Sequence, residues 1–394
     1  MAEQEVPYAS LDTPAVLVDM DKLEANIREM SQLAADAGVR LRPQIKVHES
    51  ADIARMQIEM GAYAVEVSPL GQAEAMAEAG FNDLIVAHPT LYSNRKLETL
   101  KRLLTKPGLK LTIVVDMIEQ AESVSRAGQE VGRSVPVLIK VDVNRPLGGF
   151  SRFGIPPGEP VLNLAKKLSL LPNIEFIGIY AHEVGAKPTQ ESVDKYAFEA
   201  ATLMAETAKM LRSNGFKIEH VSVGGSPTIR STCRYIKEGK FPEITEVHPG
   251  NFVIGDIVYM KNFGNTREVI AVTVLTSVMN TVHSNFAIVD AGYKTIGADS
   301  IIARREEQGF FWNDMPSFGY VQGRPDLWFG RMAAESGMLY YMDPAPEKKL
   351  HIGERLEIVP NNTTLVINIH DNMYGVRKGK IERVFPVTSR GQGN

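Results

Sequence analysis

The sequence predicts an α/β protein in which a parallel (β/α)8 TIM barrel is followed by an all-β domain. Short apolar runs alternate with helical stretches about eight times between residues 39 and 247, which is the scale of a TIM barrel. Several runs are continuous and rich in Val and Ile, as in parallel strands that are covered on both faces. After about residue 263 the helical periodicity disappears, and Gly and Pro separate short strand-like runs.

The strands of the barrel are expected, in chain order, at 39–45, 64–67, 83–87, 111–115, 137–141, 174–180, 221–223 and 246–247. Helices are expected where apolar residues recur at helical spacing, at 50–60, 70–79, 117–131, 161–168 and 192–213. A doubly wound open sheet is the alternative topology, because it is also built from alternating strands and helices.

The C-terminal domain is expected to contain strands at 268–278, 285–289, 337–341, 355–359 and 365–369. The strand-like run 15–18, which precedes a helical run at 23–37, is expected to pair with this domain. The sequence therefore predicts a barrel domain at 22–263 and a β domain at 264–394, to which residues 1–21 contribute a strand.

Composition limits the partners of the protein. Its 394 residues carry a net charge of −4, which gives no basic field for nucleic acid or an anionic membrane. The single cysteine, Cys233, has no partner for an internal disulfide. No apolar run approaches the roughly 20 residues that a membrane helix needs. We therefore expect a cytoplasmic protein that acts on a small molecule.

One lysine, Lys46, ends the first strand-like run of the barrel. The carboxyl end of a barrel strand faces the mouth in which such folds carry out their chemistry. A lysine that is removed from water there loses part of its preference for the charged form, so its amine can form a Schiff base with a carbonyl group. Lys46 is thus the primary candidate for a catalytic residue, although a lysine after a strand is usually an ordinary surface residue.

Two glycine-containing loops follow the last two barrel strands. The first reads Val221-Ser222-Val223-Gly224-Gly225-Ser226-Pro227-Thr228, and the second reads His248-Pro249-Gly250-Asn251. Glycines allow backbone N–H groups to approach a ligand, and the hydroxyls add donors, which suits a phosphate group. Barrel phosphate sites recur in these two positions, so the pair indicates a phosphorylated aldehyde that is held at two points.

Further candidates follow the fifth and sixth strands. The guanidinium group of Arg152 carries N–H donors in a forked arrangement, which can bind a cofactor ring or a carboxylate. His182 follows Tyr180 at the end of its strand, and its ordinary pKa near neutrality suits a general acid or base.

Five motifs extend the analysis over nearly the whole chain, in this order: Leu11-Asp12-Thr13-Pro14-Ala15, Arg42-Pro43-x-x-Lys46, the Val221–Thr228 loop, Glu246-x-x-Pro249-Gly250-Asn251 and Asp290-Ala291-Gly292-Tyr293-Lys294. In these motifs the chain resembles the D-threonine aldolase and D-serine dehydratase group. That group belongs to the alanine-racemase-like, fold-type III pyridoxal-phosphate enzymes.

The resemblance implies that Lys46 holds pyridoxal phosphate as a Schiff base and that the protein is a homodimer. The residues that it implies around the cofactor are Ser222, Gly224, Gly225, Ser226, Gly250 and Asn251 near the phosphate, and Arg152 and Tyr180 near the ring. It also implies a lyase that acts on a D- or β-hydroxy-amino acid, by retro-aldol cleavage or by β-elimination, with His182 as the candidate base for the β-hydroxyl.

The chain departs from the family at the metal site. In the family a histidine and a cysteine or aspartate after a Pro-Asn pair hold a divalent metal, whereas this chain has Asn362 and Thr364 there. Neither side chain is a good ligand for zinc or manganese. Gln44 also stands where a histidine is common, and His370 and Asp371 form a poor replacement pair, because neighbouring strand residues point to opposite faces. We therefore expect no metal.

Two other functions remain open. A racemase or epimerase needs only proton removal and return at Cα, and chemistry without a metal suits it. A non-catalytic pyridoxal-phosphate carrier is the third hypothesis, but the added β domain of more than a hundred residues favours an enzyme, since such a domain closes the active site in two-domain members of the fold.

Overall fold

The computed structural model describes residues 8–184, 186, 189–257, 269–299, 301–302 and 316–393. The chain forms two compact units, which are described separately. The barrel unit comprises Ile27–Lys46, Ile53–Gly250 and Gln392–Asn394, and the β unit comprises Met1–Asn26, Val47–Asp52 and Asn251–Gly391. The domain boundary predicted at residues 263 and 264 lies outside the described residues. No helix in the described ranges is both long and apolar enough to cross a membrane.

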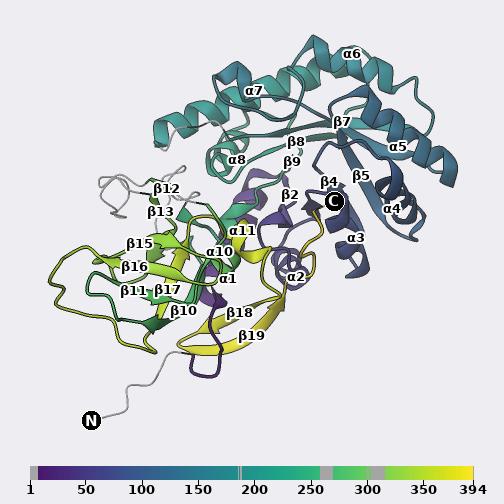
Figure 1. The fold of residues 1–394 in the computed structure, drawn as a ribbon. Helices are drawn as coiled ribbons and strands as arrows, with labels where there is room; N and C mark the ends of the chain where they lie inside the picture. The colour runs from purple at the N-terminus through teal and green to yellow at the C-terminus, as the bar shows by residue number, and fades with distance from the viewer. Residues whose placement is uncertain are drawn as a thin grey trace. The chain divides into compact units, whose positions relative to one another are not determined.

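The barrel unit is built on an eight-stranded parallel sheet, whose strand order is β2-β9-β8-β7-β6-β5-β4-β3 (Figure 1). Its strands are β2 (Arg40–Leu41), β3 (Val65–Val67), β4 (Asp83–Val86), β5 (Lys110–Val115), β6 (Val135–Lys140), β7 (Ile174–His182), β8 (His220–Gly224) and β9 (Glu246–Val247). A parallel bridge between Gln44 and Glu66 joins the two end strands. The sheet therefore curls into the expected barrel, and a strand lies at each of the eight predicted positions. The first is shorter than the predicted 39–45, since β2 covers only Arg40–Leu41 and Ile45 already lies in a 3-10 helix.

Helices follow most of these strands, as parallel connections require. They are α2 (Ala51–Glu59), α3 (Leu70–Glu78), α4 (Asn94–Thr105), α5 (Ile118–Val131), α6 (Glu159–Leu168), α7 (Gln190–Ser213) and α8 (Ile229–Lys237), and α1 (Met20–Ala37) precedes β2. The sequence prediction missed α4 and α8. Only one face of α4 is buried, through Leu100, Leu103 and Leu104, and its many charged residues obscured that pattern.

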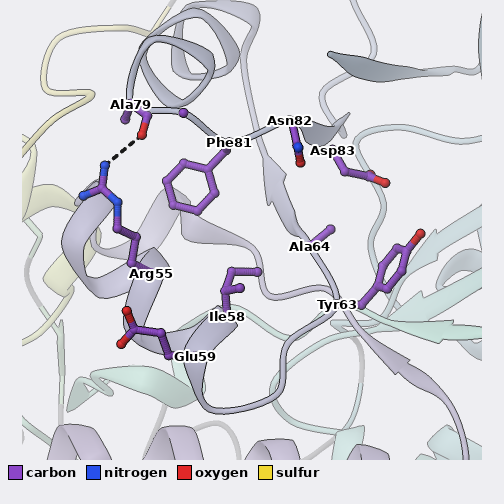
Figure 2. Close-up of a pocket in the computed structure, with 10 residues that line it drawn as sticks. Arg55, Ile58, Glu59, Tyr63, Ala64, Ala79, Phe81, Asn82 and Asp83 are labelled. Atoms are coloured by element: carbon purple, nitrogen blue, oxygen red, sulfur yellow. Dashed lines mark hydrogen bonds between the residues drawn. The ribbon is translucent and has the colours of Figure 1, made fainter. Parts of the chain in front are cut away.

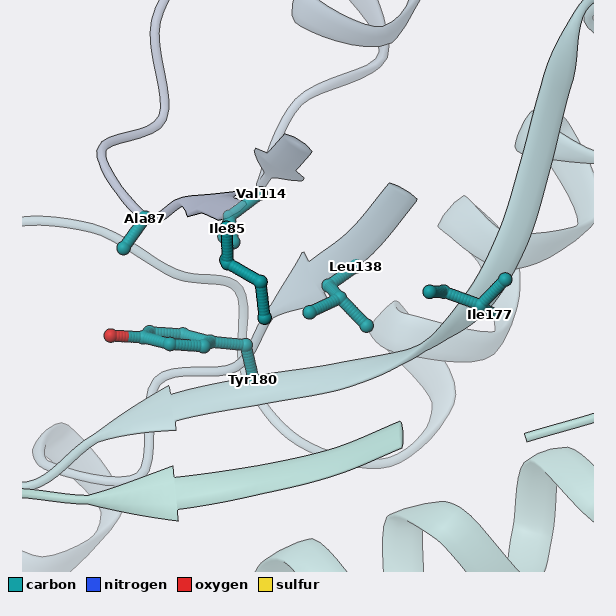
Figure 3. Packing of buried hydrophobic residues seen from close by; sticks show 6 residues of the cluster. All are labelled: Ile85, Ala87, Val114, Leu138, Ile177 and Tyr180. Carbon is teal, nitrogen blue, oxygen red and sulfur yellow. The ribbon is translucent and has the colours of Figure 1, made fainter. Parts of the chain in front are cut away.

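Side chains from neighbouring strands fill the barrel interior. Figure 3 shows one such cluster, which consists of Ile85, Ala87, Val114, Leu138, Ile177 and Tyr180. All six side chains are buried, and they come from β4 to β7 or from the residue after β4. The floor beneath the barrel mouth is therefore a packed core rather than a channel, as in other TIM barrels.

The β unit contains a nine-stranded sheet. Its strands are β1 (Ala15–Asp19), β10 (Val272–Asn280), β11 (Phe286–Val289), β14 (Gly319–Val321), β15 (Leu327–Met332), β16 (Gly337–Tyr341), β17 (Arg355–Pro360), β18 (Asn372–Arg377) and β19 (Lys380–Pro386), and a separate pair is formed by β12 (Ile301–Ile302) and β13 (Pro316–Ser317). The strand β1 pairs with β10 and β18, so the expected pairing of residues 15–18 with this domain is confirmed.

One predicted strand is wrong. The segment expected as a strand at 365–369 begins inside a short helix, α11 (Thr363–Ile367). Thr363 anchors the start of α11, since both its backbone N–H and its hydroxyl donate to Asp256 Oδ2 at 3.2 Å. The buried residues Thr363, Val366 and Ile367 have helical spacing, and such a short apolar run fits both periods. A second small helix, α10, spans Tyr293–Ile296.

Candidate active site

Lys46 lies on a short 3-10 helix, η1 (Ile45–Val47), which follows β2 at the carboxyl end of the barrel strands. Its side chain is half-buried. Burial lowers the pKa of the Lys46 amine, the positive charge of Arg152 lowers it further, and Glu66 opposes both effects. A larger share of the amine is therefore neutral than for a lysine in water, as nucleophilic attack on a carbonyl requires.

A second lysine, Lys140, ends β6 in the same mouth. Its Nζ donates to the Ala87 carbonyl at 3.3 Å and lies 5.2 Å from the ring centre of Tyr180. Burial, together with the charges of Lys46 and Arg152, lowers the pKa of Lys140 to about 8. The sequence prediction missed this residue, although the signal was the one that identified Lys46, a lysine at the end of an apolar strand.

Beneath the lysines, a buried carboxyl group belongs to Glu66 of β3. Its Oε1 accepts hydrogen bonds from Gln44 Nε2 at 2.7 Å and from the Tyr180 hydroxyl at 3.0 Å. Burial raises the pKa of Glu66 to about 8, against the lowering effect of these hydrogen bonds and of Lys140. The sequence prediction missed Glu66 as well, because Val65 and Val67 present it as an ordinary strand residue.

Tyr180 and Ser222 lie in the barrel interior next to this carboxyl group. The Tyr180 ring stacks on His248, with ring centres 4.2 Å apart and planes 12° apart. Ser222 Oγ donates to Glu246 Oε1 at 3.1 Å and lies 2.8 Å from His248 Nδ1. Because Ser222 is fully buried, these contacts define it as part of the polar network under the site, and its predicted role as a cofactor ligand stays a prediction.

Arg152 and His182 line one cavity of about 320 Å³, together with Lys140, Val141, Asn144, Phe150, Ser151, Phe153 and Val184. The structure thus brings together the candidates that follow β6 and β7. Asn144 links the two loops, since its Nδ2 donates to the His182 carbonyl at 2.9 Å and its Oδ1 accepts from the Val184 N–H at 3.1 Å. None of the nine residues is acidic, so the cavity suits an anionic ligand.

The pKa of His182 lies far from the ordinary value that the sequence-based prediction assumed. Burial and the charges of Lys140 and Lys46 lower the pKa of His182 to about 3, so the ring is neutral at physiological pH. Its Nδ1 lies 3.1 Å from the Gly224 carbonyl oxygen. A carbonyl can only accept a hydrogen bond, so Nδ1 carries the proton and Nε2 of the neutral ring is an acceptor.

The two glycine loops lie against each other, as expected. The Gly250 N–H donates to Ser226 Oγ at 3.1 Å. A Cβ on Gly224 would lie 3.0 Å from the backbone nitrogen of His248. A Cβ on Gly225 would overlap the backbone oxygen of Glu183, so only glycine fits that position. Thr228 then leads into α8, whose N-terminal N–H groups favour an anion. This cradle and the nearby lysines fit pyridoxal phosphate.

Asn251 begins η3 (Asn251–Val253), which is part of the β unit. Its Nδ2 donates to Asp256 Oδ2 at 3.0 Å, which fixes the side chain within that unit. The role of Asn251 at the phosphate stays a prediction.

The residues at the family's metal position do not fit a divalent metal. Asn361 donates to the Ser317 carbonyl at 2.7 Å, and Asn362 donates to Asp299 Oδ2 at 3.2 Å. His370 Nε2 lies 3.0 Å from the Thr295 carbonyl, and Asp371 is paired with Arg390. Across the described ranges no three His, Cys, Asp or Glu side chains converge on a possible ion position. No step of the mechanism is therefore assigned to a metal.

A separate hollow of about 280 Å³ lies beside α2 (Figure 2). Arg55 crosses it and donates to the Ala79 carbonyl at 2.8 Å, and Phe81 and Ile58 form apolar walls. Tyr63, Ala64, Asn82 and Asp83 stand at or before the first residues of β3 and β4. The hollow is thus at the amino ends of the strands, which in a TIM barrel contribute to stability rather than to chemistry, and it contains no predicted site residue.

The fold and the site define the class of protein: a barrel enzyme with a lysine of lowered pKa at a strand end and a glycine cradle for an anion beside it. Comparison with known families agrees. Residues 18–257 match the family described as "Alanine racemase, N-terminal domain", and residues 271–376 match the "Putative serine dehydratase domain". The chain belongs to the alanine racemase N-terminal domain family, as the sequence motifs indicated.

Proteins that resemble the chain over more than nine tenths of its sequence include aldolases and dehydratases, which are lyases. It is 30% identical to a 3-hydroxy-D-aspartate aldolase of Paracoccus denitrificans, over 98% of this chain and 94% of that protein. The structure of a D-threo-3-hydroxyaspartate dehydratase from Delftia sp. HT23 matches with a TM-score of 0.83 and 27% identity, over 97% and 99% of the two chains. A D-threonine aldolase from Filomicrobium marinum matches with a TM-score of 0.81 and 27% identity, over 99% and 98%. The protein is an enzyme of this type.

Proposed function

We propose that the protein is a pyridoxal-phosphate-dependent lyase that cleaves a β-hydroxy-D-amino acid, and that it does so without a divalent metal. The observation that carries the proposal is the Lys46 amine, whose pKa is lowered, at the mouth of a barrel that also holds the glycine cradle. We further propose, on the family resemblance, that the enzyme is a cytoplasmic homodimer.

The residues of the barrel mouth divide the work. Lys46 Nζ would attach the cofactor, and the backbone of Gly224, Gly225 and Gly250 would hold its phosphate. The bound cofactor supplies an electron sink for the bonds at Cα of the substrate. Lys140 and Arg152 provide positive charge for the anionic groups of cofactor and substrate. No acidic side chain lines the cavity to oppose that attraction.

The protonation state of His182 favours retro-aldol cleavage over β-elimination. Retro-aldol cleavage needs an acceptor for the β-hydroxyl proton while the Cα–Cβ bond breaks to release an aldehyde. Nε2 of the neutral ring has a lone pair for that proton, because Nδ1 donates to the Gly224 carbonyl. Its pKa of about 3 makes the ring a weak base, so the preference rests on the tautomer alone. Elimination would instead need a proton for the departing hydroxyl, which the neutral ring cannot supply at Nε2. Lys46 then returns a proton to Cα.

The test is incubation of the holoenzyme with the D and L isomers of 3-hydroxyaspartate, threonine and serine in heavy water. We expect an aldehyde and glycine from a D isomer and neither from its L isomer. We also expect the same rate after treatment with a chelator, because Asn362 and Thr364 are poor metal ligands. A keto acid with ammonia would contradict the preference for retro-aldol cleavage. Deuterium at Cα with inversion, and neither aldehyde nor keto acid, would identify a racemase.

A Gly225→Ala substitution tests the phosphate cradle. Because the added methyl group would overlap the Glu183 backbone oxygen, the loop must move and lose at least one N–H contact with the phosphate. A hydrogen bond to a charged group contributes about 1.5–3 kcal/mol, so we expect the Kd of pyridoxal phosphate to rise roughly tenfold to a hundredfold.

The matched control is Gly250→Ala, whose added Cβ would lie 3.3 Å from the Gln44 carbonyl oxygen, a tight contact that a small shift relieves. We expect it to weaken binding less than Gly225→Ala does, as measured by titration of the cofactor absorbance. Equal affinities in the Gly225→Ala variant and the unaltered enzyme would exclude the cradle as the phosphate site.

A further inference from the structure

The unusual residue Gln44 has a specific partner in the barrel. Its Nε2 donates to Glu66 Oε1 at 2.7 Å, and the backbones of the same two residues form the bridge that closes the sheet. Lys46 follows Gln44 by two positions on the same segment. Glu66 therefore holds the segment that carries the candidate catalytic lysine.

The same carboxyl oxygen also fixes an aromatic residue. Glu66 Oε1 accepts a hydrogen bond from the Tyr180 hydroxyl at 3.0 Å, and the Tyr180 ring stacks on His248. The other oxygen, Oε2, makes no hydrogen bond to any residue that the structure describes, and the nearest ring nitrogen, His248 Nδ1, is 4.0 Å away. Glu66 is fully buried. Its Oε1 accepts two hydrogen bonds, whereas Oε2 accepts none from the described residues and can gain or lose a proton.

Charged and titratable groups from several other barrel strands surround this carboxyl group. They are Lys46 after β2, Lys140 of β6, Tyr180 of β7, Glu246 of β9 and His248 after β9. A negative charge on Glu66 raises the pKa of Lys46, whereas burial and the positive charge of Arg152 lower it. Glu66 acts on Lys140 in the same direction.

We propose that Glu66 is a positioning residue for Lys46, because it fixes the segment that carries the lysine through its hydrogen bond and backbone bridge to Gln44. A second part of the role is electrostatic, since the ionised carboxyl group favours the charged form of the lysine amine. This inference rests on the proposed function of Lys46. The inference also assigns a role to Gln44, which stands where the family commonly has a histidine. A glutamine can donate a hydrogen bond to the carboxyl group while it carries no charge of its own.

Two substitutions separate the two parts of the role. Glu66→Gln keeps an oxygen that can accept from Gln44 and Tyr180 but removes the negative charge, so the pKa of Lys46 falls. Because burial raises the pKa of Glu66 to about 8, we expect this effect above about pH 8, where the carboxyl group of the unaltered protein is ionised. While the pH stays below the pKa of Lys46, the neutral share of its amine rises about tenfold for each tenfold change in its ionisation constant. Glu66→Leu removes the charge and both hydrogen bonds, so it also lowers kcat, by about 10–100-fold if the lysine moves by as much as 1 Å.

The experiment measures the pH profile of Lys46 in two ways on the full chain. One is the rate at which protein freed of cofactor reacts with a trace of acetic anhydride at Lys46, read by mass spectrometry. The other is the rate at which added pyridoxal phosphate attaches. The matched control is Glu183→Gln, which neutralises another buried carboxyl group of raised pKa that is not among the charges acting on Lys46.

We expect both profiles to move to lower pH in Glu66→Gln and Glu66→Leu. In Glu183→Gln we expect the acetylation profile to stay in place; this variant is a control for acetylation only, because the Glu183 side chain contacts Thr228 of the glycine loop. Profiles of both Glu66 variants that coincide with that of the unaltered protein would overturn the proposal, as would an equal shift in Glu183→Gln. If pyridoxal phosphate does not attach to Lys46 in the unaltered protein, the proposed function fails, and the acetylation profile still decides the role of Glu66.

Discussion

Lys46→Ala is expected to abolish covalent attachment of pyridoxal phosphate and to reduce lyase activity by at least the 10²–10⁴-fold that a positioned acid or base contributes. The substitution removes both the amine that attaches the cofactor and the group that moves the Cα proton. The glycine cradle is unchanged, so the phosphate can still bind without a covalent bond. Borohydride reduction followed by mass spectrometry of the tryptic peptides measures the attachment.

The decisive control is Lys140→Ala, because Lys140 shares the barrel mouth and has its own pKa lowered to about 8 by burial. We expect the Lys140→Ala protein to keep the reduced adduct on Lys46, with weaker binding of the anionic cofactor. An adduct found on Lys140 in the unaltered protein would mean that the wrong lysine has been assigned. The comparison separates the two assignments because both amines belong to one barrel, one after β2 and the other at the end of β6, and each variant removes only one of them.

The sequence was sufficient for the groups that follow the strands. Residues after a barrel strand face the mouth regardless of packing details, so Lys46, Arg152, His182 and the two glycine loops could be found from strand ends alone. Lys140 obeyed the same rule and was overlooked because it was counted as part of the strand.

The groups within the strands could not be found in this way. Glu66 lies inside a strand whose two faces are both buried, so the apolar pattern does not say which face points into the barrel. Ser222 was named from its motif, but its contacts in the buried network could not be predicted. Their partners, Gln44 and His248, come from other segments of the chain, and only the closed sheet brings them together. The pKa of His182 could not be predicted from the sequence either, since it depends on burial and on two lysines from other segments of the barrel.

Arg42 is expected to stabilise the barrel through two ion pairs, one of them fully buried. It is 1% exposed, its Nε donates to Glu246 Oε2 at 3.0 Å, and its Nη1 donates to Asp83 Oδ1 at 2.7 Å. Glu246 is fully buried and also accepts from Ser222, which connects the ion pair to the polar network under the site. Removal of one partner of such a pair leaves an uncompensated buried charge.

We expect Arg42→Met to lower the free energy of unfolding by about 3–5 kcal/mol, measured by urea denaturation. The matched control is Arg102→Met, which breaks an exposed pair with Glu74 at 2.6 Å and should cost about 0.2–1 kcal/mol. If the penalty comes from the unpaired Glu246 carboxylate, the double variant Arg42→Met with Glu246→Gln should recover part of the loss, because the two effects are then not additive. Additive losses in the double variant would instead place the cost in the packing of the Arg42 side chain.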